Sequence, residues 1–242
     1  MLLAAGRGER MRPLTDTLPK PLLEVRGKPL MQWPMEALAE GGFDTLAVNT
    51  AWLGERIVER FGTQPDAGTA GISRPVRIAY SHEGLDFGGA LETAGGIVRA
   101  LPLLDDIFWV VAGDVFAPDF RFDEAAVERF ASGGKLAHLW LVPNPDHNPR
   151  GDFGLSDDGL AQDEVPAGQA RWTFSTIALY RAAFFAPPRC VIAPGNPQGI
   201  AAPLAPMLRA AMKKAQVSAE RYLGSWTDVG TPARLDALNQ VS

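Results

Sequence analysis

Short apolar segments alternate along this chain with longer segments in which apolar residues recur every three or four positions. The short segments predict β-strands at residues 1–4, 45–49, 76–80, 107–112, 136–142 and 171–180. The longer segments predict α-helices at residues 29–40, 53–60, 91–100, 123–131, 203–215 and 232–239. Because strands that alternate with helices are typical of crossover connections, we expect an α/β protein with a mostly parallel sheet.

The strand predicted at residues 107–112 is apolar on both faces, which is typical of a strand that helices cover on two sides. We therefore expect a Rossmann-like fold of three layers, with a mostly parallel mixed sheet in the middle. Pro34 lies inside the first predicted helix, where it should kink that helix or delay its start. Residues 62–75 and 143–170 are rich in Gly, Pro and polar residues and predict long irregular segments, which are often functional.

Composition and charge restrict the class of protein. The chain has 242 residues, 46% of them hydrophobic, and we expect residues 1–242 to form a single domain. A net charge of −5 without a block of Lys or Arg argues against non-specific binding of nucleic acid. No segment contains the roughly 18 apolar residues of a membrane helix, so we expect no membrane partner. The single cysteine, Cys190, cannot form an internal disulfide, which favours a reducing, cytoplasmic compartment.

The segment directly after the first predicted strand, residues 3–15, is rich in glycine and arginine. It is not a dinucleotide fingerprint, because Met11 stands where a third glycine is needed and Pro13 forbids the following helix. It remains a glycine turn at the end of a strand, whose N–H groups and cations could bind phosphate. An exposed basic loop without a ligand is the alternative. The cations concerned are Arg7, Arg10, Arg12 and Lys20.

Two aspartates are candidate metal ligands. Asp114 follows the strand predicted at residues 107–112, and ligands of open α/β sheets bind at the carboxyl ends of strands. Asp228 directly precedes the last predicted helix. Mg²⁺ is usually held by one or two carboxylates, with substrate phosphates and water completing the coordination. Aspartate is also common at strand ends and helix caps, so each residue has an ordinary structural alternative.

These segments resemble the signature of the sugar-1-phosphate nucleotidylyltransferases, in the form Leu3-Ala4-Ala5-Gly6-x-Gly8-x-Arg10-Met11-x-Pro13-Leu14-Thr15 with Lys20-Pro21-Leu22. Within that family, the chain looks most like the short N-acetylmuramate α-1-phosphate uridylyltransferases. The motifs that carry this likeness are Asn49-x-Ala51-Trp52-Leu53-Gly54, Leu91-Glu92-Thr93-Ala94-Gly95-Gly96-Ile97, Gly113-Asp114-Val115, Asn144-Pro145, Arg150-Gly151-Asp152-Phe153, Thr173-Phe174-Ser175 and Trp226-x-Asp228-Val229-Gly230-Thr231.

The resemblance implies transfer of a uridylyl group from UTP to a sugar 1-phosphate, with Mg²⁺, in cell-wall recycling by a monomer or weak homodimer. Residues 1–115 would hold the nucleotide and residues 116–242 the sugar phosphate. The implied nucleotide contacts are Ala5, Gly6 and Gly8 along the phosphates, Arg10 and Lys20 at the reacting phosphorus, and Glu92, Thr93, Ala94 and Gly95 around the base. The implied metal ligands are Asp114 and Asp228, and the implied sugar-phosphate contacts are Asn144, Asp152, Glu164 and Ser175.

The chain also departs from the family pattern. Thr176 stands where relatives usually carry Gly after Phe-Ser, and residues 85–90 are additional. No Glu-Glu-Lys-Pro segment, which many hexose-specific relatives carry, is found near residues 162–164. These differences leave the nucleotidyl transfer intact and leave the sugar open. Two alternatives are a mannose-1-phosphate guanylyltransferase and a catalytically inactive, nucleotide-sensing relative.

Overall fold

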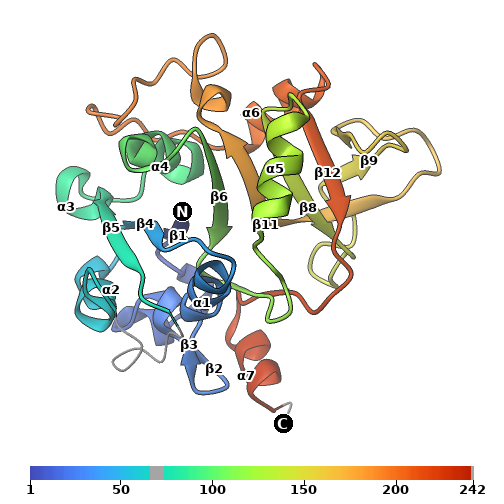
Figure 1. Ribbon diagram of the computed structural model, residues 1–242. Helices are drawn as coiled ribbons and strands as arrows, with labels where there is room; N and C mark the ends of the chain where they lie inside the picture. Colours follow the sequence, from blue (N-terminus) through green and yellow to red (C-terminus); the bar gives the residue numbers. More distant parts are fainter. Residues whose placement is uncertain (66–73, 241–242) are drawn as a thin grey trace.

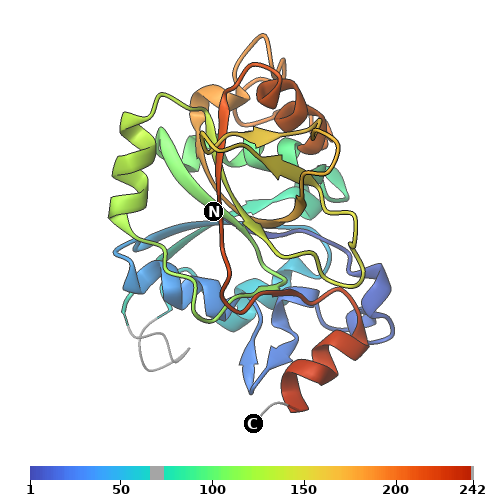
Figure 2. The same cartoon turned by 90° about the vertical axis from the view of Figure 1, so that its right-hand side faces the viewer.

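The computed structural model describes residues 1–65 and 74–240, and its centre is a sheet with helices on both sides (Figures 1 and 2). The strands run in the order β10-β9-β11-β6-β1-β4-β5, and β8 pairs with β11 and β12. Their bounds are β1 Leu2–Ala4, β4 Thr45–Thr50, β5 Arg77–His82, β6 Ile107–Ala112, β8 Ala137–Val142, β9 Phe153–Leu155, β10 Ala161–Gln162, β11 Arg171–Arg181 and β12 Val217–Arg221.

The sheet is mixed. Strand β1 runs parallel to both β4 and β6, and β4 runs parallel to β5. Strand β11 is antiparallel to β6, β8 and β9, whereas β12 is parallel to β8. The predicted α/β fold with a mostly parallel mixed sheet is therefore confirmed.

Alternating residues of the strands place helices on the two faces. Phe108 and Val110 of β6 belong to the apolar cluster that includes α4 and α6, whereas Trp109 and Val111 belong to the cluster that includes α1, α2 and α5. This explains why β6 is apolar throughout. The helices are α1 Gln32–Glu40, α2 Gly54–Phe61, α3 Glu83–Phe87, α4 Glu92–Ala100, α5 Glu124–Ser132, α6 Ala205–Met212 and α7 Pro232–Gln240.

The first helix differs from its prediction. It begins at Gln32, because Pro29 lies in the small strand β3 (Lys28–Pro29), which pairs with β2 (Glu24–Val25). Pro34 falls in the first turn of α1, where a backbone N–H has no intrahelical partner in any case. The proline therefore fits a helix with a delayed start.

The C-terminal helix α7 packs on the β2–β3 hairpin, far away in sequence (Figure 2). Asn239 receives a hydrogen bond from the backbone N–H of Arg26 at 2.6 Å and donates one to the carbonyl of Glu24 at 3.1 Å. The chain that leads into α7 pairs there with the end of the β6 region, since β13 (Thr227–Asp228) is antiparallel to β7 (Val115–Phe116). This crossing brings the C-terminal segment beside residues 24–29 and beside the segment that follows β6.

Some helices and strands were not predicted, namely α3, β2, β3, β7, β9, β10, β12 and β13. Two of them, β9 and β10, lie in the segment 143–170, which is therefore less irregular than expected. Of the other irregular segment, 62–75, residues 66–73 lie outside the described residues.

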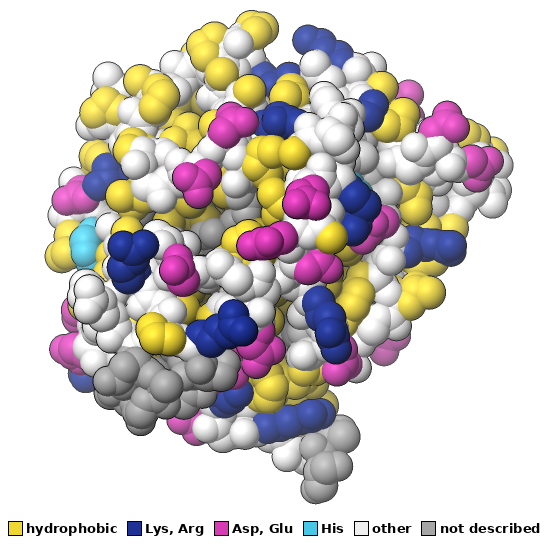
Figure 3. Space-filling model, in the orientation of Figure 1, with side chains coloured by type: hydrophobic (Ala, Val, Ile, Leu, Met, Phe, Trp, Pro, Cys, Tyr) yellow, Lys and Arg dark blue, Asp and Glu magenta, His cyan; other side chains and the backbone are white. Residues whose placement is uncertain are grey.

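Cys190 is buried at 4% exposure. No helix among the described residues has the length and apolar character that crossing a membrane requires. Acidic and basic side chains of the described residues are interspersed over the face drawn in Figure 3.

Candidate active site

A cavity of about 780 Å³ opens at the carboxyl ends of the parallel strands, on the face of the sheet that α4 and α6 cover. Its wall includes Ala4 of β1, Asn49 of β4 and Ala112 of β6. The chain runs outward from β1 to β4 and β5 and then returns to β6 on the other side of β1. A reversal of strand order of this kind leaves a crevice, and ligands of open α/β sheets bind there.

The glycine turn after β1 forms one end of the cavity, where Ala5, Gly6 and Gly8 all line the wall. Gly8 has a φ of +69°, and a Cβ added there would lie 3.0 Å from Thr15 Cγ2. Thr15 also donates a hydrogen bond from Oγ1 to the Gly8 carbonyl at 2.8 Å. A glycine is therefore required at residue 8 for the turn to close against Thr15.

The three arginines of this segment have different surroundings. Arg7 lies over the Trp52 ring at 3.6 Å and donates to the Thr15 carbonyl at 2.9 Å, and Arg12 pairs with Asp16 at 2.8 Å. Arg10 lines the cavity, and within residues 1–65 and 74–240 it has no ion pair. Of the three, Arg10 is thus the cation available to an anionic ligand.

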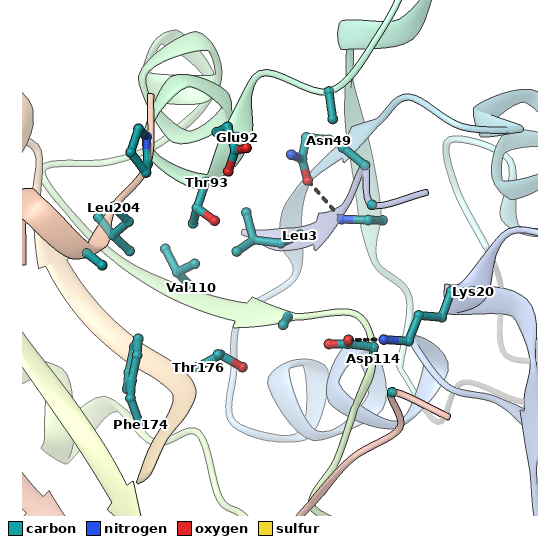
Figure 4. Close-up of a pocket in the computed structure, with 18 of the residues that line it drawn as sticks. Leu3, Lys20, Asn49, Glu92, Thr93, Val110, Asp114, Phe174, Thr176 and Leu204 are labelled. Atoms are coloured by element: carbon teal, nitrogen blue, oxygen red, sulfur yellow. Dashed lines mark hydrogen bonds and ion pairs between the residues drawn. The ribbon is translucent and has the colours of Figure 1, made fainter. Parts of the chain in front are cut away.

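Lys20 and Asp114 meet inside the cavity as an ion pair (Figure 4). Lys20 is buried at 9% exposure, and Asp114 follows β6, which runs beside β1. Because the carboxyl ends of β1 and β6 are adjacent, the segments that follow them converge. An ammonium and a carboxylate therefore stand beside the glycine turn.

Asp228 is far from Asp114 in sequence, but strand pairing brings the two residues side by side. It is paired with Val115 across β13 and β7, and the Val229 N–H donates to the Asp114 carbonyl at 2.9 Å. The Asp228 carboxylate is held by Arg234 at 2.5 Å and by His147 at 2.9 Å. Asp228 is not part of the cavity wall, although its neighbour Gly230 is.

The carboxylates of Asp114 and Asp228 are compatible with a divalent cation that takes most of its ligands from the substrate and from water. The described residues contain no group of three or more His, Cys, Asp or Glu side chains placed to hold a metal by themselves. Asp114 directly precedes β7, and Asp228 lies on β13, which pairs with β7; this pair suits Mg²⁺, which binds one or two carboxylates together with substrate phosphates and water.

A buried carboxylate, that of Glu83, is linked by hydrogen bonds to the residues next to the glycine turn. Glu83 is 0% exposed, and its carboxylate accepts hydrogen bonds from the Leu91 N–H and from Asn49 Nδ2, both at 2.7 Å. Asn49 Oδ1 in turn accepts from the Ala4 N–H at 2.9 Å (Figure 4). Burial raises the pKa of Glu83, while these hydrogen bonds act in the opposite direction. This network ties the end of β1 to the start of α4.

The predicted contacts around the base divide into two pairs. Glu92 and Thr93 line the cavity and face its interior in Figure 4. Ala94 and Gly95 do not line it, and their N–H groups donate to the Ala202 carbonyl at 2.9 and 3.1 Å. Ala94 and Gly95 therefore join α4 to the segment before α6, and their contact with the base stays a prediction.

The predicted sugar-phosphate contacts divide in the same way. Asp152 lines the cavity and accepts a hydrogen bond from the Phe174 N–H at 2.8 Å. Ser175 lies off the wall, since it is 0% exposed and donates to the Trp140 carbonyl at 2.7 Å; its contact with the sugar phosphate stays a prediction. Asn144 and Glu164 also lie off the wall. Asn144 donates to the Arg171 carbonyl at 3.0 Å, and the Glu164 side chain is 89% exposed.

Several wall residues were not predicted as site residues. A polar residue at the end of an apolar strand could have drawn attention to Asn49, whereas Glu83 and Arg209 leave no comparable signal. Burial also raises the pKa of the Tyr180 hydroxyl on this wall. The other unpredicted wall residues include Phe153, Phe174, Thr176, Pro203, Leu204 and Leu208.

The three-layer fold and a cavity that places a glycine turn beside Lys20 and Asp114 define the chain as an α/β protein with a candidate site for an anionic ligand. The nucleotidyl transferase family model matches residues 1–166, more than half of the chain, and the chain belongs to that family. The chain is therefore a nucleotidyltransferase, and enzymes of this family generally use a divalent metal ion.

Two curated relatives with the same name are similar to this chain. The chain is 46% identical to N-acetylmuramate alpha-1-phosphate uridylyltransferase of Neisseria meningitidis, over 97% of this chain and 94% of the relative. It is 39% identical to the protein of the same name from Caulobacter vibrioides, over 67% of this chain and 66% of the relative.

Solved structures share the fold. A Bacillus anthracis chain assigned as a glucose-1-phosphate thymidylyltransferase, crystallised with sucrose, has a TM-score of 0.76 at 20% identity, covering 98% of this chain and 92% of that one. An apo UDP-glucose pyrophosphorylase has a TM-score of 0.71 at 16% identity, covering 98% and 95% of the two chains.

Proposed function

We propose that this protein transfers the uridylyl group of UTP to N-acetylmuramate 1-phosphate, giving the UDP-sugar and pyrophosphate. The observation that carries the proposal is the 46% identity to a uridylyltransferase of that name over 97% of the chain. The cavity supports it with one end suited to phosphates, formed by the glycine turn with Arg10 and Lys20, and a second wall from Asp152, β11 and α6. We assign the nucleotide to residues 1–115 and the sugar phosphate to residues 116–242.

The reaction needs no protein group to remove a proton. A phosphate monoester has a second pKa near ~6 and is mostly a dianion at neutral pH. One of its oxygens attacks the α-phosphorus of UTP, and the bond from that phosphorus to the pyrophosphate oxygen breaks as the new P–O bond forms. The electron pair of the broken bond leaves with pyrophosphate.

The protein's task is to bring two polyanions together in line and to stabilise the developing charge. In this proposal the N–H groups of the glycine turn orient the triphosphate. Arg10 and Lys20 contact the α-phosphate and the leaving pyrophosphate, and Lys20 exchanges its partner Asp114 for phosphate oxygens. Asp114 and Asp228 are the residues that would hold Mg²⁺, which when bound neutralises phosphate charge.

The remaining assignments are also proposals. We assign Glu92 and Thr93 to the uridine base and Asp152 to the sugar phosphate, because all three line the cavity. In the cell, the reaction would serve the recycling of cell-wall sugars in the cytoplasm, with the protein acting as a monomer or a weak homodimer.

A crossed assay of pyrophosphate release tests this function. UTP, GTP, dTTP and CTP are each combined with N-acetylmuramate, N-acetylglucosamine, glucose and mannose 1-phosphates in the presence of Mg²⁺. We expect the highest kcat/KM for UTP with N-acetylmuramate 1-phosphate. Preference for GTP with mannose 1-phosphate would make the protein a guanylyltransferase instead, and no release with any pair would favour a nucleotide sensor.

A further inference from the structure

Thr176 has an unfavourable backbone conformation on the cavity wall. Its φ is +62°, in the left-handed region where a Cβ crowds the neighbouring carbonyl oxygen. Six non-glycine residues among those described have positive φ, and Thr176 is the β-branched one of the six. A β-branched residue in this region is a genuine outlier, and strain of this kind clusters at functional sites.

Strand β11 has a bulge at Thr176 that imposes this backbone conformation. The bulge does not depend on the Thr176 side chain. The register between β11 and β8 shifts between Phe174 and Ala178. Ser175 holds the shift, because its Oγ donates to the Trp140 carbonyl at 2.7 Å and accepts from the Ile177 N–H at 3.1 Å. A glycine at residue 176 would satisfy the same backbone without strain, so the threonine side chain calls for another explanation.

The side chain of Thr176 points from β11 into the cavity, between Phe174 and Asp114 (Figure 4). Its hydroxyl donates its single hydrogen to the Ser175 carbonyl at 2.6 Å. The same carbonyl accepts a hydrogen bond from Trp226 Nε1 at 3.1 Å. Because the hydrogen of the hydroxyl is already used, Thr176 Oγ1 offers a ligand only its lone pairs.

We propose that Thr176 is a specificity-determining residue whose Oγ1 accepts a hydrogen bond from an O–H or N–H group of the acceptor sugar. This inference rests on the proposed function. An ionised phosphate has no hydrogen to give, so Oγ1 does not pair with the triphosphate while it donates to Ser175. Sugar hydroxyl and acetamido groups are donors of the required kind. Thr176 lies between Asp114 and the wall formed by Phe174, and in the proposed function this is where the sugar would join its phosphate.

Two near-isosteric variants separate the oxygen from the shape of the side chain. Thr176→Val keeps the branched volume and removes Oγ1, whereas Thr176→Ser keeps the oxygen. With N-acetylmuramate 1-phosphate, we expect Thr176→Val to raise the KM for the sugar phosphate about five- to tenfold, with the KM for UTP unchanged. Thr176→Ser should remain within about twofold of wild type. A wild-type KM in Thr176→Val, or an equal rise in the KM for UTP, would overturn the proposal.

Thr176→Gly separates binding from a structural role. It removes the side chain and relieves the left-handed backbone, so we expect an unchanged or higher Tm together with the same rise in the KM for the sugar phosphate. A lower Tm with an unchanged KM would show that the side chain serves the fold and would overturn the proposal.

The wild-type control distinguishes this inference from the proposed function. If wild-type protein releases no pyrophosphate from UTP with any sugar 1-phosphate, the proposed function fails and the role of Thr176 fails with it. If wild type is active and the Val and Gly variants keep its KM for the sugar phosphate, the role of Thr176 alone is rejected.

Discussion

Arg10 and Arg12 are two positions apart and carry the same charge, yet Arg10 lines the cavity and Arg12 is paired with Asp16. The sequence showed a cluster of cations after the first strand, but it did not show which of them has an acidic partner. That distinction depends on the two turns between residues 9 and 16, which bring Asp16 to Arg12. At the residue scale, the sequence predicted that cations lie beside the site. It could not predict which cation is free to bind a ligand, because that depends on the folded positions of the acidic residues.

The two arginines form a matched pair for mutation. Arg10→Ala should lower kcat/KM for UTP about 10- to 100-fold, because it removes charge-assisted hydrogen bonds to phosphate. Arg12→Ala should leave kcat/KM within about twofold, since it removes an exposed ion pair away from the cavity. Steady-state kinetics with varied UTP measure both. Equal losses in the two variants would contradict the assignment of Arg10.

Lys20 can be compared with Lys28, which also pairs with an acid, Glu36, but lies outside the cavity wall. Lys20→Ala should lower kcat about 100- to 1000-fold, the size of effect seen when one charge-stabilising donor is removed. Lys28→Ala should keep wild-type kcat. The measurement is the rate of pyrophosphate release at saturating substrates. A wild-type kcat in Lys20→Ala, with the fold checked by circular dichroism, removes Lys20 from the mechanism.

At the scale of elements, the six predicted strands all occur, and β6 has the predicted bounds. Apolar patterns identify such elements because both faces are buried. Short elements are harder to identify: β12, with the sequence Val-Ser-Ala-Glu-Arg, alternates apolar and polar residues over only four positions. Ala94, Gly95 and Ser175 lie off the cavity wall, and their polar groups bond to backbone from segments far away in sequence, which the local pattern does not show.

The link between β1 and α4 depends on Glu83, which accepts from both Leu91 and Asn49. In Glu83→Gln, an amide N–H₂ must face one of these donors, so we expect a loss of about 1–3 kcal/mol in the free energy of unfolding. Urea denaturation measures it. The exposed Glu128→Gln on α5 is the control and should change stability by less than about 0.5 kcal/mol.

Glu83 also gives the stability a defined pH dependence. Burial raises its folded-state pKa above the ordinary value of 4.5. The folded state therefore holds this proton more tightly than the unfolded chain does. The contribution of this proton to the free energy of unfolding is complete below pH 4.5, the ordinary pKa, and is lost as the pH rises through the raised folded-state pKa. The advantage of wild type over Glu83→Gln should accordingly shrink as the pH rises above 4.5 and through the raised folded-state pKa. An advantage that grows with pH would show that the folded-state pKa is lowered.

At the scale of the whole molecule, the net charge of −5 coexists with a cavity that presents Arg10 and Lys20 to a ligand. The fold achieves this by placing the segments after β1 and β6 side by side and by returning the chain through β13 to Asp114. The overall charge therefore gives no information about the ligand. The cavity is assembled from segments that span most of the chain.

Removal of the metal ion should abolish the activity of the enzyme without unfolding it. Asp114 and Asp228 pair with Lys20 and Arg234 within the protein itself, so the fold does not depend on a bound cation. We expect EDTA to abolish pyrophosphate release and added Mg²⁺ to restore it, with the Tm unchanged throughout. Full activity in EDTA would reject the metal assignment, and a large fall in Tm would show that a metal supports the fold.

The central claim is that an oxygen of the sugar 1-phosphate attacks the α-phosphorus of UTP. The most direct test uses N-acetylmuramate 1-phosphate labelled with ¹⁸O at its non-bridging phosphate oxygens, with mass spectrometry of both products. The proposed reaction predicts that the UDP-sugar keeps all of the label and that pyrophosphate carries none. Label in the pyrophosphate, or its loss from the UDP-sugar, would contradict the mechanism.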